Sequence, residues 1–412
     1  MGSIKPVEFS ERKLGAWDLT AIWFGAGISI AEFWAGALLT PGTTLFKGFL
    51  ANVIGHVIGN TLLGLVAIIG FTVGLPTMVL FRKSLGLRGS FIASALNYIQ
   101  LIGWTAVMNI VAARALQEVF STFDVNLDYT LAVVLMGLLN TLWAIAGPEK
   151  WRYIGKISAS LLLVLISWLT VVTIKSVGSF DWNIGEGTMP FTTALDLVVA
   201  MPVSWIPLVA DYSRFVKSNK KGVFFATALG YFASSGLFYF IGSTTNAFLG
   251  APDPIKIIAF YGLGIPAMII IILSTTTTTF MDIYSAAVSI INIDPRRNIT
   301  KQTLLAGLLG TIIAVVFPID KYEHFLLFIG AAFIPLTSII IADCYIIEKG
   351  SYEPNKILNS PEYNIAGIAS WAIGFAIYIA ITYTVPWIGG TLPTILSTMI
   401  IYIILHRITL SQ

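Results

Sequence analysis

The sequence predicts an all-α integral membrane protein with about twelve transmembrane helices. Of its 412 residues, 56% are hydrophobic and only 11% are charged, whereas a soluble domain carries roughly 25% charged residues. The stretches 157–174, 257–281 and 302–319 contain no Asp, Glu, Lys or Arg. About 20 apolar residues cross the hydrocarbon core as a helix. An open strand edge is not tolerated in lipid, so the spans are expected to be helices.

Twelve spans follow from the apolar segments and the turn-forming breaks between them. Their expected ranges are 17–41, 48–73, 90–119, 129–147, 153–177, 191–212, 222–248, 262–291, 303–318, 323–347, 363–384 and 388–406. No stretch outside them is long enough for a separate domain. Residues 1–412 are therefore expected to form a single transmembrane domain.

The basic residues predict the orientation. With a cytoplasmic N-terminus and alternating sides, all but five of the 24 Lys and Arg fall on the cytoplasmic side; the exceptions are Lys47, Arg114, Lys175, Lys256 and Lys321. The positive-inside rule then places both termini in the cytoplasm of a multi-pass protein of the cell membrane. The net charge of +3 reflects this bias and indicates no nucleic acid partner. The first apolar segment is too long for a cleavable signal peptide.

Two spans carry residues that interrupt helices. The first contains Gly25 and Gly27, and the sixth contains Pro202 and Pro207. Glycine weakens a helix and proline removes a backbone donor. Interrupted helices in corresponding positions indicate a transporter built from two five-helix halves. The alternative is that Gly and Pro are simply common in membrane helices.

The eighth span contains the run STTTTT at 274–279. Ser274, Thr277 and Thr278 have i, i+3, i+4 spacing and share one helical face. Hydroxyls together with carbonyls freed at a helix break would provide oxygen ligands for sodium. The alternative is that these hydroxyls pack helices or bond back to the carbonyl four residues earlier.

The third span places Gln100, Trp104 and Met108 on one face. Trp104 lies half-way along its span, which favours an interior role over anchoring at the lipid interface. Trp205 lies beside the prolines of the sixth span. Two tryptophans facing a cavity would suit a planar ligand that forms hydrogen bonds.

These motifs resemble the nucleobase–cation symporter family, the permeases for cytosine, purines, allantoin and hydantoins. The resemblance covers nearly the whole chain and is carried by WFGAGISIAEFWAG at 23–36, IQLIGW at 99–104, ADYSRF at 210–215 and IIIADCYI at 339–346. Within this family the chain is most similar to the CytX-type branch, the hydroxymethylpyrimidine permeases of thiamine salvage. This similarity is carried by ISIAE in the first span, LIGWTAVM in the third and MDIYSAAVS in the eighth.

The resemblance implies a LeuT-type fold: an inverted repeat of five plus five helices, with a first repeat of about 16–177, a second of about 190–348 and extra helices at about 363–406. It also implies a sodium ion as the coupling ion and no organic cofactor. The implied ion ligands are main-chain oxygens of Gly25, Ile28 and Ser274, together with Thr277 and Thr278.

The implied substrate site lies between the third helix and the interruption of the sixth. The residues expected to contact substrate are Ser29, Glu32, Gln100, Trp104, Ser204, Trp205 and Thr279. Cytosine and hydantoin permeases have asparagine at the position of Thr279, and this departure argues against cytosine itself. The position of Gln100, four residues before the tryptophan, has no settled equivalent in the family.

Two acidic residues lie within spans, where a carboxylate is costly and usually marks a site. Glu32 is expected to accept hydrogen bonds from the amino edge of an aminopyrimidine. The alternatives are a proton-coupling carboxylate or a structural bond to a neighbouring helix. Asp282 is expected to stabilise the cytoplasmic half of the eighth span. His56 is expected to be hydrogen-bonded packing, and Asp211 and Arg214 end the sixth span.

The sequence thus predicts a secondary active transporter, a sodium-coupled symporter whose best candidate substrate is hydroxymethylpyrimidine. The alternative is a cytosine, purine or hydantoin permease, with coupling to protons as a further alternative. An enzyme is disfavoured because the chain has no HExxH motif and no cysteine cluster. A channel is disfavoured because it has no repeated filter loop. The expected partners are a small heteroaromatic molecule, sodium and the bilayer, with the chain as a monomer.

Overall fold

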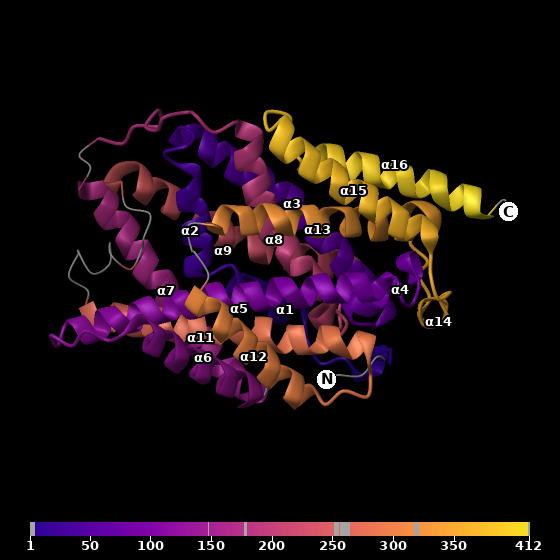
Figure 1. The fold of residues 1–412 in the computed structure, drawn as a ribbon, viewed down its shortest axis with the longest axis horizontal. Coiled ribbons are helices and arrows are strands. Elements are labelled where there is room, and N and C mark those ends of the chain that lie inside the picture. Colours follow the sequence, from indigo (N-terminus) through magenta and orange to yellow (C-terminus); the bar gives the residue numbers. More distant parts are fainter. Residues whose placement is uncertain are drawn as a thin grey trace.

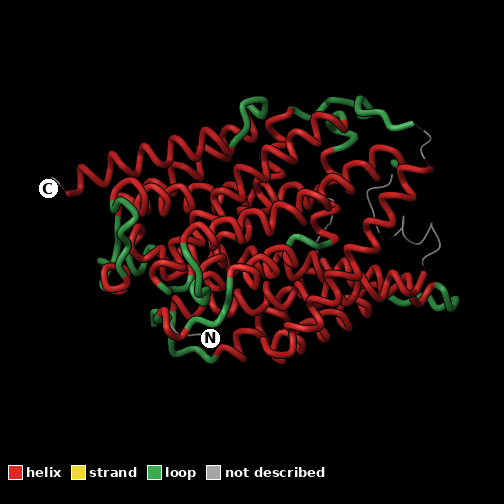
Figure 2. The backbone as a smooth tube through the Cα atoms, turned by 180° about the vertical axis from the view of Figure 1, so that it is seen from behind, coloured by secondary structure: helices red, strands yellow, loops and turns green. Residues whose placement is uncertain are grey.

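The computed structural model describes residues 5–146, 148–176, 179–250, 255, 264–316 and 321–410; within these ranges it leaves out the side chains of 148–156, 159, 176, 277 and 410. The described residues form helices joined by loops (Figures 1 and 2). The elements are η1 (Phe9–Glu11), α1 (Ala16–Ala26), α2 (Ile30–Leu39), α3 (Leu45–Val73), α4 (Thr77–Leu85), α5 (Ser90–Ser121), α6 (Tyr129–Ala146), α7 (Pro148–Ser176), α8 (Phe191–Ser213), α9 (Lys220–Leu249), α11 (Gly264–Ile293), α12 (Ile299–Val316), α13 (Tyr322–Ile341), the π-helical η3 (Ala342–Ile347), α14 (Pro354–Leu358), α15 (Ile365–Thr384) and α16 (Thr391–Leu410).

The helices agree with the predicted spans. Ten described helices are long and apolar enough to cross a membrane, and the bent pair α1 and α2 makes an eleventh span. The remaining predicted span, 153–177, coincides with α7, whose described apolar part is Ser160–Lys175. The short helices α4 and α14, which lie between spans, were not predicted.

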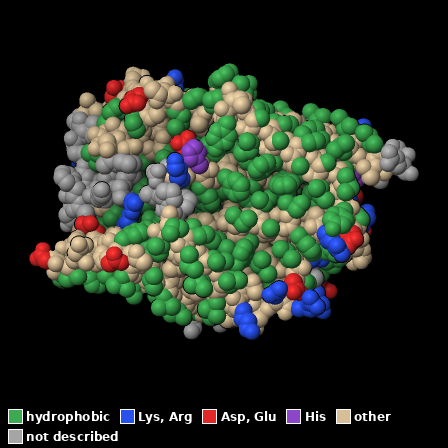
Figure 3. All heavy atoms as spheres, in the orientation of Figure 1, with side chains coloured by type: hydrophobic (Ala, Val, Ile, Leu, Met, Phe, Trp, Pro, Cys, Tyr) green, Lys and Arg blue, Asp and Glu red, His purple; other side chains and the backbone are tan. Residues whose placement is uncertain are grey.

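The helices pack in three groups. α1, α2, α3, α8 and α9 pack mainly on one another, and α5, α6, α11 and α12 form a second group. α13 packs on α8 and carries the hairpin of α15 and α16, which lies along the upper edge in Figure 1. On the face shown in Figure 3, hydrophobic side chains cover the middle and charged side chains gather mostly towards the two ends of the long axis. That distribution suits a bilayer whose normal lies along this axis.

The predicted interruption of the first span is confirmed. α1 ends at Ala26, α2 begins at Ile30, and the two helices meet at 59°. Ser29 is extended and caps α2, since its Oγ accepts from the backbone N–H of Ala31 at 3.1 Å. A Cβ on Gly27 would lie 2.3 Å from Ser234 Oγ of α9, so the break packs too closely against α9 for any other residue.

The predicted interruption of the sixth span is wrong. α8 is one helix from Phe191 to Ser213, with Pro202 and Pro207 inside it. Side chains add hydrogen bonds close to the prolines: Ser204 Oγ donates to Met201 O at 2.6 Å, and Gln100 Nε2 donates to Ser204 O at 2.9 Å. Membrane helices tolerate proline where neighbouring helices and Ser or Thr side chains satisfy nearby backbone groups.

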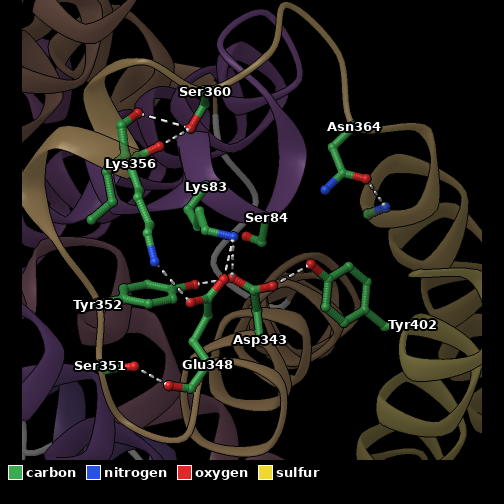
Figure 4. A network of polar contacts seen from close by, with 12 residues as sticks. Lys83, Ser84, Asp343, Glu348, Ser351, Tyr352, Lys356, Ser360, Asn364 and Tyr402 are labelled. Atoms are coloured by element: carbon green, nitrogen blue, oxygen red, sulfur yellow. Dashed lines mark hydrogen bonds and ion pairs between the residues drawn. The ribbon is translucent and has the colours of Figure 1, made fainter. Parts of the chain in front are cut away.

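The end of the molecule that carries α4 and α14 is held by a polar network (Figure 4). Asp343 of η3 accepts from the hydroxyl groups of Tyr352 and Tyr402, the latter at 2.7 Å. Lys83 of α4 lies 2.9 Å from Glu348. Burial raises the pKa of Glu348, but the ammonium groups of Lys83 and Lys356 outweigh it and hold that pKa below its usual value. The network fixes the end of α13 against α4 and α16.

Candidate functional site

Glu32 lies at the start of α2 and is buried, with 1% of its surface exposed. Two hydroxyl groups of α9 meet its carboxyl group. Tyr231 donates to Oε1, and Ser235 Oγ lies 2.8 Å from Oε2. The structural bond to a neighbouring helix, one of the three interpretations of Glu32, is therefore present. Each carboxylate oxygen has two lone pairs, and the contacts with α9 use one on each oxygen. The predicted hydrogen bonds from Glu32 to a substrate therefore stay a prediction.

The contacts of Glu32 continue on both sides. Ser235 Oγ lies 2.6 Å from Nε2 of His56, whose Nδ1 lies 2.9 Å from Asn52 O. His56 is thus hydrogen-bonded packing, as predicted. On the other side, Trp205 Nε1 donates to the Tyr231 hydroxyl at 2.9 Å. Glu32 and Trp205, both predicted to touch substrate, are joined through Tyr231 rather than directly.

Three of the predicted residues, Gln100, Trp104 and Ser204, lie with Ala31 and Tyr322 where α2, α5, α8 and α13 converge. We call these five residues the central junction. Gln100 joins α5 to α8 through its bond to Ser204 O. The Trp104 ring lies edge-on to Tyr322, with centroids 6.0 Å apart. The Tyr322 hydroxyl donates to Ala31 O at 3.2 Å. The junction therefore connects the first-span helix that carries Glu32 to the predicted aromatic platform.

Two polar atoms on the α5 side of the central junction have no hydrogen-bond partner among the described residues. They are Gln100 Oε1 and Trp104 Nε1, and both are fully buried. Because these residues are four apart, the atoms belong to one face of α5. A buried polar group without a partner costs about 1–3 kcal/mol. The pair offers one acceptor and one donor to a flat ligand beside an aromatic ring.

Two hydroxyl groups of the predicted site bond back to their own helix, α11. Thr278 Oγ1 donates to Ser274 O at 3.1 Å, and Thr279 Oγ1 donates to Thr275 O at 2.6 Å. A hydroxyl oxygen that donates keeps its lone pairs for a cation or a ligand donor. The side chain of Thr277 lies outside the described part, so nothing is added to its prediction. The ion-ligand roles of Gly25, Ile28 and these α11 residues remain predictions.

Tyr231, Ser235 and Tyr322 were not predicted from the sequence. Tyr231 and Ser235 stand four apart in the seventh span, so the spacing could have shown that they share a face. The sequence does not show that this face meets Glu32. Tyr322 follows Lys321 at the beginning of its span and looks like an interfacial aromatic residue.

Four acidic residues are buried in the described part of the chain: Glu32, Asp196, Asp282 and Asp343. Three of them form two hydrogen bonds each through the carboxyl group. Asp282, 3% exposed, accepts none from the described residues. No hydrogen bond from the described residues therefore supports the expected stabilising role of Asp282 in α11.

Replacing Asp282 tests that role. Asp282→Asn is expected to leave the melting temperature of the detergent-purified protein unchanged or higher, because it removes a buried charge and breaks no bond. Asp196→Asn is the matched control. Its carboxylate accepts from the backbone N–H groups of Gly390 and Thr391 at 2.6 and 3.0 Å, and the amide would cost about 1–3 kcal/mol. A large loss in Asp282→Asn alone would restore the structural role.

The fold places the central junction inside a bundle of helices that are long and apolar enough to cross a membrane. Comparison with known proteins gives the class. The family model described as "Permease for cytosine/purines, uracil, thiamine, allantoin" matches residues 6–402, and the chain belongs to this family. It is a secondary transporter of a nucleobase-like substrate and not an enzyme.

Relatives and solved structures agree with this assignment. The cytosine permease of Escherichia coli (strain K12) is 28% identical over 408 residues, covering 98% of this chain and 93% of the relative. The hydantoin permease of Microbacterium maritypicum is 24% identical, covering 92% and 83%. The inward-facing structure of Mhp1 has a TM-score of 0.87 at 20% identity, covering 98% and 93%. A closed form of Mhp1 with bromovinylhydantoin bound has a TM-score of 0.86 at 20% identity, covering 98% and 94%. The Mhp1 likeness confirms the predicted LeuT-type fold.

Proposed function

We propose that the protein is a sodium-coupled symporter of an aminopyrimidine, with hydroxymethylpyrimidine as the best candidate. The observation that carries the proposal is the unpartnered pair Gln100 Oε1 and Trp104 Nε1 in the central junction. An aminopyrimidine has an amino group that donates to an amide oxygen. Its ring nitrogens accept from an indole N–H, and its flat ring packs on aromatic side chains.

Cytosine is the second candidate, and its support is the 28% identical cytosine permease. Cytosine is also an aminopyrimidine and would use the same two atoms. Thr279 favours hydroxymethylpyrimidine, because the resemblance places asparagine at this position in cytosine permeases. A threonine hydroxyl that bonds back to Thr275 O offers a ligand one acceptor oxygen, whereas an amide offers a donor and an acceptor.

The sodium part of the proposal rests on the chemistry of the α1–α2 break and of α11. A hard cation without a strong carboxylate site needs several oxygen ligands. Among the described residues, no group of three or more His, Cys, Asp or Glu could hold a metal ion. Hydroxyl and main-chain oxygens are the remaining kinds of ligand. Thr278 has a hydroxyl oxygen, and the interruption between α1 and α2 after Ala26 has main-chain oxygens. These ligands suit a weakly held monovalent ion.

Thr278→Val tests the ion site. Valine keeps the shape and removes the hydroxyl oxygen, so the sodium affinity should fall roughly ten- to a hundredfold. By linkage, the effect of sodium on ligand affinity should fall too. The measurement is the thermal shift of the purified protein with hydroxymethylpyrimidine and cytosine over a sodium titration.

Thr303→Val is the matched control. Thr303 of α12 is equally buried and donates to Ile299 O at 2.9 Å, the same kind of bond that Thr278 makes. It should keep the wild-type sodium dependence. A sodium titration in Thr278→Val that matches Thr303→Val would remove Thr278 from the ion site.

A further inference from the structure

The hydrogen bonds between Glu32 and His56 constrain where protons lie. His56 Nδ1 faces Asn52 O at 2.9 Å. A carbonyl oxygen only accepts, so Nδ1 must carry a hydrogen. The other ring nitrogen, Nε2, faces Ser235 Oγ at 2.6 Å. In a neutral imidazole with Nδ1–H, Nε2 can only accept.

Ser235 has one hydroxyl hydrogen and two neighbours that both need one. Its Oγ lies between His56 Nε2 and Glu32 Oε2, at 2.6 and 2.8 Å. If His56 is neutral and Glu32 is ionised, the serine can satisfy only one of them, and the other contact brings two lone pairs together. Both side chains are fully buried, with 0% and 1% exposed, so water cannot supply the missing hydrogen.

One additional proton satisfies every contact. If it sits on Glu32, the acid donates to Ser235, Ser235 donates to His56 Nε2, and Nδ1–H donates to Asn52 O. If it sits on His56, imidazolium Nε2–H donates to Ser235 and Ser235 donates to the Glu32 carboxylate. The two forms differ by proton shifts along existing hydrogen bonds, and neither changes the net charge of the pair.

We propose that Glu32, Ser235 and His56 form a proton-binding relay that holds one dissociable proton within the membrane core. The proton resides on Glu32, because a neutral pair avoids placing two charges in a buried setting. The occupant is a proton rather than a metal ion, since the two contacts at Ser235 are hydrogen-bond lengths and leave no room for a cation between the atoms.

The groups that face the relay support a neutral acid. Tyr231 and Tyr239 of α9 and Tyr322 of α13 are the titratable groups whose charge would act on Glu32. His56 packs against the rings of Phe232 and Tyr239, also on α9. α8 contributes Trp205, which does not titrate. Among the described residues, no lysine or arginine forms an ion pair with Glu32 or His56.

The relay is connected through Tyr231 to Trp205 of α8, one of the residues predicted to contact substrate. Tyr231 donates to Glu32 Oε1 and accepts from Trp205 Nε1. Loss of the proton would strengthen the Tyr231–Glu32 bond, because a charged acceptor binds a donor more tightly. The position of Trp205 would respond. The relay therefore deepens the proposed function by adding a proton to the ions that act on the site, although the relay itself requires neither sodium nor a particular ligand.

Infrared spectroscopy of the whole protein in phosphatidylethanolamine–phosphatidylglycerol vesicles tests the relay without any ligand. A protonated carboxyl group has a C=O stretch that a carboxylate lacks. At neutral pH the wild type should show this band for Glu32, and the difference spectrum between the wild type and Glu32→Gln should show its loss. The glutamine amide can donate to Ser235 as the protonated acid does, so the variant should keep the wild-type melting temperature. A matched Asp196→Asn variant should keep the band.

Nitrogen NMR of His56 gives a second readout that needs no variant at position 32. The relay predicts a neutral ring with hydrogen on Nδ1, and His56→Asn identifies the signal. An imidazolium together with no Glu32 band would still place the single proton in the relay. A neutral His56 together with identical wild-type and Glu32→Gln infrared bands would overturn it. Neither result bears on sodium or ligand dependence, so failure of the relay and failure of the proposed function are separate findings.

Discussion

Trp104→Ala is expected to abolish ligand binding while the protein still folds. Trp104 is 5% exposed and its ring meets those of Tyr322 and Phe325 at 6.0 and 5.3 Å. The substitution removes the platform and the unpartnered indole N–H together. Stacking contributes about 0.5–1.5 kcal/mol beyond area burial, and the lost hydrogen bond about 1 kcal/mol more. With the lost contact area, affinity should fall by about a hundredfold or more.

Two other tryptophan variants make this result specific. Trp104→Phe keeps a ring but loses the N–H, so binding should be weakened and not lost. Trp371→Ala removes a partly buried tryptophan of α15, which donates to Ala332 O at 3.1 Å, and should leave affinity unchanged. Binding is measured by isothermal titration of the purified protein. Wild-type affinity in a folded Trp104→Ala protein would show that this ring does not meet the ligand.

Gly242→Ala is expected to destabilise the protein severely. A Cβ at this position of α9 would lie 2.0 Å from Phe33 O of α2, and backbone on both sides leaves nothing flexible to give way. Overpacking a close contact typically costs about 1–3 kcal/mol, and a clash with backbone belongs at or above the upper end. Gly36 of α2 lies in the same close contact between α2 and α9, because a Cβ there would lie 2.2 Å from Tyr239 O.

Gly236→Ala is the matched control, because it changes the same helix by the same methyl group. The nearest atom to a Cβ there is Asn52 Oδ1, at 4.0 Å. Alanine also favours a helix over glycine by about 1 kcal/mol. The melting temperature in detergent should fall sharply for Gly242→Ala and hold or rise for Gly236→Ala. Equal melting temperatures would show that α2 and α9 pack less closely than the structure indicates.

Apolar length and charge placement predicted the spans well, because the bilayer imposes a fixed length on every helix. The break near Gly27 was also predictable, since glycine weakens a helix and Ser29 is a good cap. The prolines of α8 led to a wrong prediction, because the packing of neighbouring helices can keep a helix that contains proline continuous. Gln100 of α5 donates to Ser204 O between the two prolines, and the sequence of α8 does not show this contact.

The site was predicted more by residue type than by contact. Trp104, Gln100 and Ser204 were singled out, and the structure brings them together. Glu32 was recognised as unusual, yet its partners were not, because they depend on how α9 rotates about its axis against α2. Such rotations are set by close contacts of the kind at Gly242 and Gly36, and a single sequence does not reveal them.

The proposed activity of the protein is sodium-coupled uptake of an aminopyrimidine. The decisive measurement is uptake of labelled hydroxymethylpyrimidine and of labelled cytosine into proteoliposomes that contain the purified protein, with an inward sodium gradient or with potassium in its place. We expect saturable accumulation of at least one of the two that depends on the sodium gradient and is lost in Trp104→Ala. Uptake of neither compound, or uptake that is equal in sodium and potassium, would contradict it.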